Sequence, residues 1–234
     1  MSAVAVIGVE MRNGGMRRMV IEDIWPPYAL RLSSGDMELS PVREVDLPEL
    51  AEIARGGVRR NGVQAFIVDW DSGSDEQIAR NLAQYHWATR ANFTVDDWTI
   101  EFTVRVGERI VGIQGVTGRR FPQTRTVSTG SWLARAEQGK GLGTRARGIM
   151  IDAFITHFDA ERFETAYFDG NVASRRVSEK LGYSPNGDRR TIGQNGTTQI
   201  ENKMVLFSED FRRHPGEVEV AGAETVRAFL GLPD

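Results

Sequence analysis

The stretch Glu137–Gly148, "EQGKGLGTRARG", places three alternating glycines directly before a segment with helical periodicity. Glycines permit a tight turn, and the first amides of a helix have no intrahelical acceptor, so such a loop suits a phosphate. We expect Lys140, Arg145 and Arg147 to add positive charge near a further phosphate. A plain turn whose glycines serve only packing remains the alternative.

Spacing excludes the two familiar nucleotide loops. A Walker A loop needs Ser or Thr after its lysine, but Lys140 is followed by Gly141. A dinucleotide fingerprint starting at Gly139 needs a third glycine at the position of Thr144. The remaining pattern over residues 138–143 is Q-x-x-G-x-G, which predicts a backbone nest able to hold a pyrophosphate.

The composition describes a globular chain of 234 residues with a net charge of −3 and no cysteine. This length suits one large domain, and the charge gives no positive field for nucleic acid. Without cysteine there are no disulfides, thiolate metal sites or cysteine nucleophiles, which fits a reducing cytosol. No apolar run approaches the roughly 20 residues that span a bilayer, and "MSAVAVIGVE" lacks the basic leader of a signal peptide. We therefore expect a cytoplasmic protein with no metal, nucleic-acid or membrane partner.

Periodicity predicts an α/β domain with a mixed sheet at residues 29–212, after a partly ordered leader (1–28) and before a C-terminal extension (213–234). Strict alternation in "WTIEFTVRV" and a Gly107-Glu108 turn predict a hairpin. Asp46 and Ser74 are expected to cap two helices before it. The other expected elements are a strand pair around 33–36, strands near 125–134, 162–168 and 199–207, and helices over 141–158, after Asn171 and near 223–232.

A second motif, "NVASRRVSEKLGY" at Asn171–Tyr183, follows the glycine loop at a characteristic separation. Together the two motifs resemble the GNAT acyltransferase superfamily, in particular the ribosomal-protein N-terminal acetyltransferase-like branch. The loop matches its Q/R-x-x-G-x-G/A pattern, and the helix matches N-x-x-S-x-x-V-x-E-K-L-G-F/Y. The resemblance runs from about Ala29 to Phe211. It implies a mixed, twisted sheet of six or seven strands with helices on both faces, in which the strands ending at Leu133 and at Phe168 splay apart.

The resemblance also implies a cosubstrate, acetyl-CoA or another acyl-CoA such as succinyl-CoA, lying in the splay. Its pyrophosphate would sit on loop amides, its pantetheine arm would pair like a strand, and an amide near Trp132–Leu133 would bind the oxyanion. The residues implied to bind coenzyme A are Trp132, Leu133, Gln138, Gly139, Lys140, Gly141, Gly143, Thr144, Asn171, Ser174 and Lys180.

Two catalytic roles need side chains. For the departing thiolate the candidates are Tyr183 and Ser174, each with a structural alternative: Tyr183 packing after a capping glycine, and Ser174 bonding a helix amide. For the base, relatives often carry a glutamate two residues before the strand glycine, where this chain has Ser128.

A substitute base is therefore sought elsewhere. The candidates are Glu101 on the polar face of a neighbouring strand, His86 in the second helix, and Glu137. A chain of water in place of any base remains open.

The acceptor is expected to be a primary amine, on a small molecule, a protein N-terminus or a lysine. Tyr85, Trp87 and Trp98 are candidates to shape its pocket. The basic loop at 118–125, with Arg119, Arg120 and Arg125, suits a succinyl carboxylate. N-succinyl transfer and a degenerate coenzyme A-binding module thus remain alternatives, and a homodimer is possible.

Overall fold

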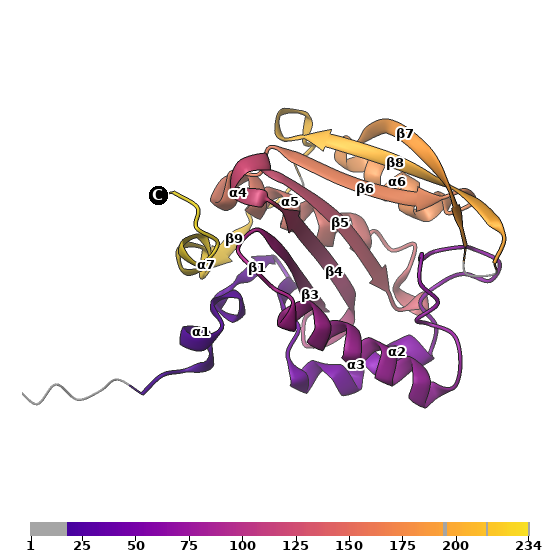
Figure 1. Cartoon of the computed structure of the whole chain (residues 1–234), viewed down its shortest axis with the longest axis horizontal. Coiled ribbons are helices and arrows are strands. Elements are labelled where there is room, and N and C mark those ends of the chain that lie inside the picture. The colour runs from indigo at the N-terminus through magenta and orange to yellow at the C-terminus, as the bar shows by residue number, and fades with distance from the viewer. Residues whose placement is uncertain (1–17, 194–195, 214, 234) are drawn as a thin grey trace, which may run out of the picture.

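The computed structural model describes residues 18–193, 196–213 and 215–233, and their strands form one twisted sheet (Figure 1). Across the sheet the order is β7-β8-β6-β5-β4-β3-β2-β1-β9. Within this part of the chain, all neighbouring pairs whose register is known are antiparallel except β5 and β6. The strands are β1 (Arg31–Ser34), β2 (Met37–Pro41), β3 (Asp97–Val106), β4 (Arg109–Arg119), β5 (Thr126–Leu133), β6 (Arg162–Phe168), β7 (Ser184–Ile192), β8 (Thr198–Phe207) and β9 (Glu219–Ala221).

Helices cover both faces of the sheet, so the predicted α/β architecture is confirmed (Figure 1). One face carries α2 and α3, and the other carries α5 and α6. None of the helices within the described ranges is long and apolar enough to cross a membrane. The α-helices are α1 (Ile21–Ile24), α2 (Leu47–Arg55), α3 (Asp75–Ala91), α4 (Phe121–Thr124), α5 (Leu142–Phe158), α6 (Val172–Leu181) and α7 (Ala223–Phe229). Short 3-10 helices occupy Pro26–Ala29, Glu44–Asp46, Arg135–Glu137 and Ser208–Asp210.

The main core lies between the sheet and α5. The apolar side of the predicted hairpin, represented by Phe102 and Val104, packs there with Ile149 and Phe154 of the helix. Asp46 differs from its predicted role, because its side chain does not cap α2. Its carboxylate instead accepts hydrogen bonds from Arg105 (2.5 Å) and Thr103 (3.0 Å), which fixes the start of α2 on β3.

The sheet is wider than the predicted six or seven strands, because β7 and β9 extend its two edges. The β7 sequence, "SPNGDRRTI", is polar and almost wholly exposed, so it lacks the alternation that marks a half-buried strand. Strand β9 has three residues and pairs with β1 from within the expected extension. On the same side Phe229 contacts Trp25 and Phe93, so both flanking segments pack on the domain. Residues 1–17 of the expected leader lie outside the described residues.

The predicted splay is present between β5 and β6. The two strands pair only from Thr126–Arg162 to Ser128–Glu164, whereas β5 stays paired with β4 as far as Leu133. Beyond Ser128, the edge of β5 that faces β6 has no paired strand among the described residues and borders a gap, although the Thr165 hydroxyl still donates to the Thr129 carbonyl (3.1 Å).

Candidate active site

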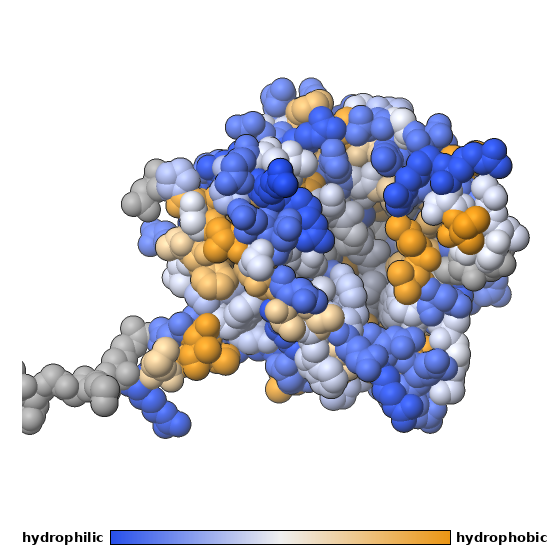
Figure 2. All heavy atoms as spheres, in the orientation of Figure 1, coloured by the Kyte–Doolittle hydropathy of each residue, from blue (hydrophilic) through white to orange (hydrophobic). Residues whose placement is uncertain are grey.

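A cavity of about 1560 Å³ opens at this gap. Its walls come from β5, β6, the glycine loop, α6, part of α3, the loop from Val58 to Trp70, and the β7–β8 hairpin. The space-filling view shows the hollow in this face of the molecule (Figure 2). Both predicted motifs therefore meet at a single cavity.

The glycine loop is open toward this cavity. Gly139 and Gly141 adopt positive φ angles of 81° and 84°, a conformation that favours glycine, and Gly141 is the N-cap of α5. Among the described residues, no atom lies within 4 Å of a Cβ built on Gly141. The unpaired first amides of α5 are therefore accessible to an anion.

Most of the predicted loop residues line the cavity, namely Gln138, Gly139, Gly141, Gly143 and Thr144. Lys140 is exposed and is absent from the described lining, and its Nζ lies 3.0 Å from Glu137 Oε2. The Gln138 side chain donates to the carbonyls of Val58 (2.8 Å) and Leu133 (3.0 Å). It thereby ties the loop to the end of β5 and to the segment after α2.

The other two predicted phosphate cations bind residues outside the glycine loop, although Arg147 does line the cavity. Arg145 holds the β1–β2 turn through Asp36 (2.5 Å), and Arg147 is buried beside β5. Instead, Arg60 lies at the loop, with Nη2 3.6 Å from a Cβ built on Gly139, and lines the cavity. Sequence reasoning missed Arg60 because nothing local places the segment after α2 over a loop some eighty residues later.

The second motif forms the opposite wall. Asn171 caps α6 as expected, since its Oδ1 accepts from the Ser174 amide (3.2 Å). Asn171, Ser174 and Lys180 all line the cavity, as do Trp132 and Leu133 across the gap.

Tyr183 lies one layer behind this wall. It is 5 % exposed, and it is not among the described residues that line the cavity. Its hydroxyl is 3.4 Å from the Oγ1 of Thr129, which does line the cavity. Burial raises the pKa of Tyr183. The structure thus does not bring Tyr183 and Ser174 together on one surface.

Glu101 is the candidate base that the fold places at the gap. Its carboxylate lines the cavity and accepts a 2.6 Å hydrogen bond from the Tyr85 hydroxyl. Burial raises the pKa of Glu101 to about 7, against a smaller lowering by this bond. The side chain lies across Gly115 of β4, where a Cβ would come within 2.7 Å of both carboxylate oxygens. Gly115 pairs in turn with Gly130 of β5, so neither of these two residues places a side chain between Glu101 and the gap.

The other base candidates fit less well. Burial lowers the pKa of His86 to about 4, and within the described part of the chain its Nε2 has no hydrogen-bond partner. Glu137 bonds Lys140 and Arg109, which lower its pKa. Of the aromatic candidates, Tyr85 lines the cavity.

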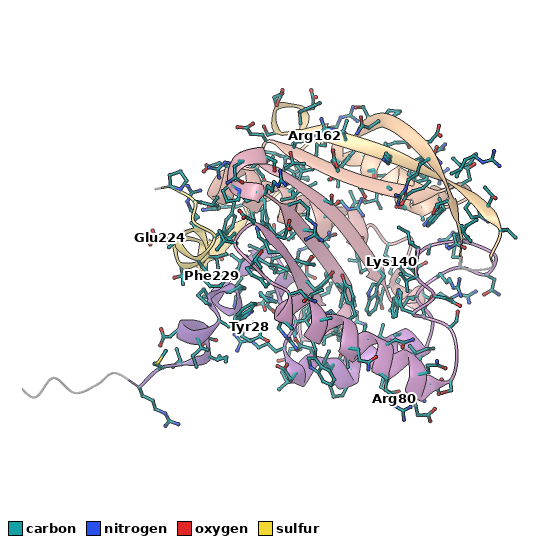
Figure 3. The ribbon with its side chains drawn as sticks, viewed as in Figure 1. Tyr28, Arg80, Lys140, Arg162, Glu224 and Phe229 are labelled. Atoms are coloured by element: carbon teal, nitrogen blue, oxygen red, sulfur yellow. The ribbon has the colours of Figure 1, made fainter. Side chains whose placement is uncertain are left out.

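The remaining acceptor-side candidates are placed elsewhere. Trp98 belongs to the main core, and Trp87 is half exposed, away from the cavity wall as far as the chain is described. The arginines expected to meet a succinyl group, Arg119, Arg120 and Arg125, are also absent from the described lining. They lie where β5 begins, at the end of the sheet that carries Arg162 (Figure 3).

Comparison with known proteins gives matches along most of the chain. A model of the acetyltransferase (GNAT) domain matches residues 36–184. A probable N-acetyltransferase of Bacillus subtilis, YjcK, is 28% identical over 86 residues, which are 36% of this chain and 48% of that protein. The chain thus aligns with about half the length of this curated relative.

Solved structures share the fold at low sequence identity. Mycobacterium smegmatis RimJ in complex with CoA-disulfide has a TM-score of 0.66 at 17% identity, over 85% of this chain and 92% of that one. Spermidine N-acetyltransferase from Vibrio cholerae, in complex with CoA and spermine, has a TM-score of 0.58 at 16% identity, over 75% and 97%. The ribosomal-protein-S5-alanine acetyltransferase from Vibrio fischeri has a TM-score of 0.59 at 19% identity, over 77% and 99%.

Proposed function

We propose that this chain, which belongs to the acetyltransferase (GNAT) domain family, transfers an acyl group from acyl-CoA to a primary amine. The expected donor is acetyl-CoA. The observation that carries the proposal is the Glu101 carboxylate, which lies in the same cavity as the open glycine loop and has a pKa of about 7. One end of the cavity suits a phosphate, and the other holds a group poised to accept a proton near neutral pH.

The geometry supports direct attack in a ternary complex. The pyrophosphate would bind the first amides of α5, and the pantetheine arm would follow the free edge of β5 beyond Ser128. The thioester would then lie near the Trp132–Leu133 amides, which would stabilise the oxyanion. The amine would approach from the side of Glu101 and lose its proton to that carboxylate.

An amine acceptor is consistent with the relatives, whose names include spermidine and ribosomal-protein acetyltransferases. For this chain we propose a primary amine on a small molecule, a protein N-terminus or a lysine. Donor and acceptor can be tested together, by incubating the protein with acetyl-CoA or succinyl-CoA and a panel of amines. Released thiol gives the rate, and mass spectrometry identifies the product. Tight coenzyme A binding without turnover on any amine would instead support a binding module.

The contact between Glu101 and Gly115 gives a specific prediction. Gly115→Ala places a methyl group against the carboxylate, so we expect kcat to fall by about 10²-fold through misplacement of the base. Coenzyme A affinity, measured by calorimetry, should not change because the loop is untouched.

A second substitution makes this prediction specific to the carboxylate. Glu101→Asp retracts the group by one methylene, so adding Gly115→Ala to that variant should have little further effect on kcat. Additive losses in the double variant would show that Gly115 does not act through Glu101.

A further inference from the structure

Arg147 is a buried cation in the wall of the cavity. It is 3 % exposed and projects from α5 beneath the gap. Its two terminal nitrogens donate to the hydroxyls of Ser178 and Ser131, each at 3.1 Å, and within the described residues its Nε has no acceptor. Both of its hydrogen-bond partners are neutral.

No carboxylate in the described ranges forms an ion pair with Arg147, and those on the elements around it are bound to other arginines. These pairs are Asp152–Arg213, Glu164–Arg162, Glu179–Arg175 and Glu201–Arg189. Besides Arg147 itself, Asp152 and Glu179, the charged residues that α5 and α6 carry are the cations Arg145, Arg175, Arg176 and Lys180. The titratable group that interacts with Arg147 is the Tyr183 phenol. A buried cation without a counter-charge is unfavourable, so this position favours an anion supplied by a ligand.

The location of Arg147 indicates which part of the ligand it meets. On one face of a strand such as β5, side chains two residues apart are separated by about 7 Å along the strand. On the α5 side, Leu133 lies by Gly143 of the glycine loop, Ser131 binds Arg147, and Thr129 contacts Tyr183. Arg147 therefore lies deeper in the cavity than the glycine loop. It lies beside Ser131, at a level of β5 where pairing with β6 has already ended.

We propose that the Arg147 guanidinium binds the sulfur of coenzyme A and stabilises the thiolate that leaves during transfer, an inference that rests on the proposed function. In that step the amine nitrogen bonds to the acyl carbon, the carbon–sulfur bond breaks, and its electron pair stays on sulfur. The amine proton goes to the Glu101 carboxylate. The thiolate then leaves paired with Arg147 and is protonated later from solvent, so Tyr183 need not reach it.

The direct test titrates the thiol of coenzyme A bound to the intact protein, using the ultraviolet absorbance of the thiolate. Because a nearby cation lowers a thiol pKa, the midpoint should fall at least one pH unit below that measured with Arg147→Met. Arg147→Lys keeps the charge and should give an intermediate midpoint. Equal midpoints in all three proteins would overturn the proposal.

Binding provides a second readout that does not need turnover. At a pH where the bound thiol is ionised, Arg147→Met should weaken coenzyme A by about tenfold to a hundredfold. It should leave desulfo-coenzyme A, which lacks the sulfur, unchanged. Equal weakening of both ligands would assign Arg147 to another part of the cofactor and overturn the proposal.

Kinetics separate this role from recognition of the acyl group. Arg147→Met should lower kcat/KM for acetyl-CoA and succinyl-CoA by the same factor, whereas a loss confined to succinyl-CoA would show a carboxylate site instead. Melting temperatures control for folding, and Met is expected to be tolerated because it removes an unpaired buried charge. A wild-type protein with no turnover would refute the proposed function, while the titration and desulfo comparison would still decide the role of Arg147.

Discussion

Replacing Glu101 by glutamine is expected to lower kcat by about 10²- to 10⁴-fold, the contribution typical of a positioned general base. Wild-type kcat/KM should rise with pH through about 7, as the carboxylate loses its proton, and then level off. The Glu101→Gln variant should lack this step. Coenzyme A affinity should be retained, because the substitution is remote from the glycine loop.

Two further measurements establish that this loss comes from the base. Glu164→Gln removes another cavity carboxylate, one paired with Arg162, and should keep both the rate and its pH profile.

The pH dependence of folding stability gives an independent test of the raised pKa of Glu101. Since the folded pKa of Glu101 is raised, the native state retains its proton between about pH 4.5 and 7, and this group's contribution to stability falls as pH rises through that window. At pH values above 7, the Glu101→Gln variant should therefore have a higher melting temperature than the wild-type protein. A lower melting temperature at the same pH would indicate a structural role for Glu101.

Gly143→Asp is expected to abolish measurable coenzyme A binding, with a loss of at least about a hundredfold. The new carboxylate would place negative charge at the N-terminus of α5, where the phosphates must bind. Gly141→Asp should have the same effect, with added strain from the positive φ angle there.

The matched control is Gly143→Ala. A Cβ at this position would lie 3.5 Å from Leu133 and 3.9 Å from Val177, which are ordinary contacts, so the fold should be kept. Calorimetry should then show only a small loss for alanine. Comparable affinities for the alanine and aspartate variants would refute the placement of the pyrophosphate.

The features that sequence alone could predict are those specified by short-range patterns. Glycine spacing predicted the open loop before α5, Asn171 predicted the cap of α6, and alternation predicted the β3–β4 hairpin. Each depends on residues within one or two elements. Strand β7 gave no such signal, because its exposed polar residues gain their order from pairing with β8.

The chemistry of the site depends on contacts that no local pattern contains. Glu101 could be named as a candidate, but its raised pKa comes from burial in the folded chain. Its position depends on a hydrogen bond from Tyr85 of α3 and on a glycine at the paired position of β4. Arg147 was expected near a phosphate. The helical period did contain a signal, because position 147 lies three residues before Met150 and seven before Phe154, on the buried stripe of α5.

The pairing of β9 with β1 also affects the order in which the sheet can be completed during synthesis. The outer neighbour of β1 is translated almost two hundred residues after β1 itself. Until then the nascent domain presents an unpaired strand edge, which is a template for pairing with other chains. Closing that edge is a long-range contact of the kind that forms slowly. Residues 219–221 therefore protect this edge of the sheet only once they have themselves left the ribosome.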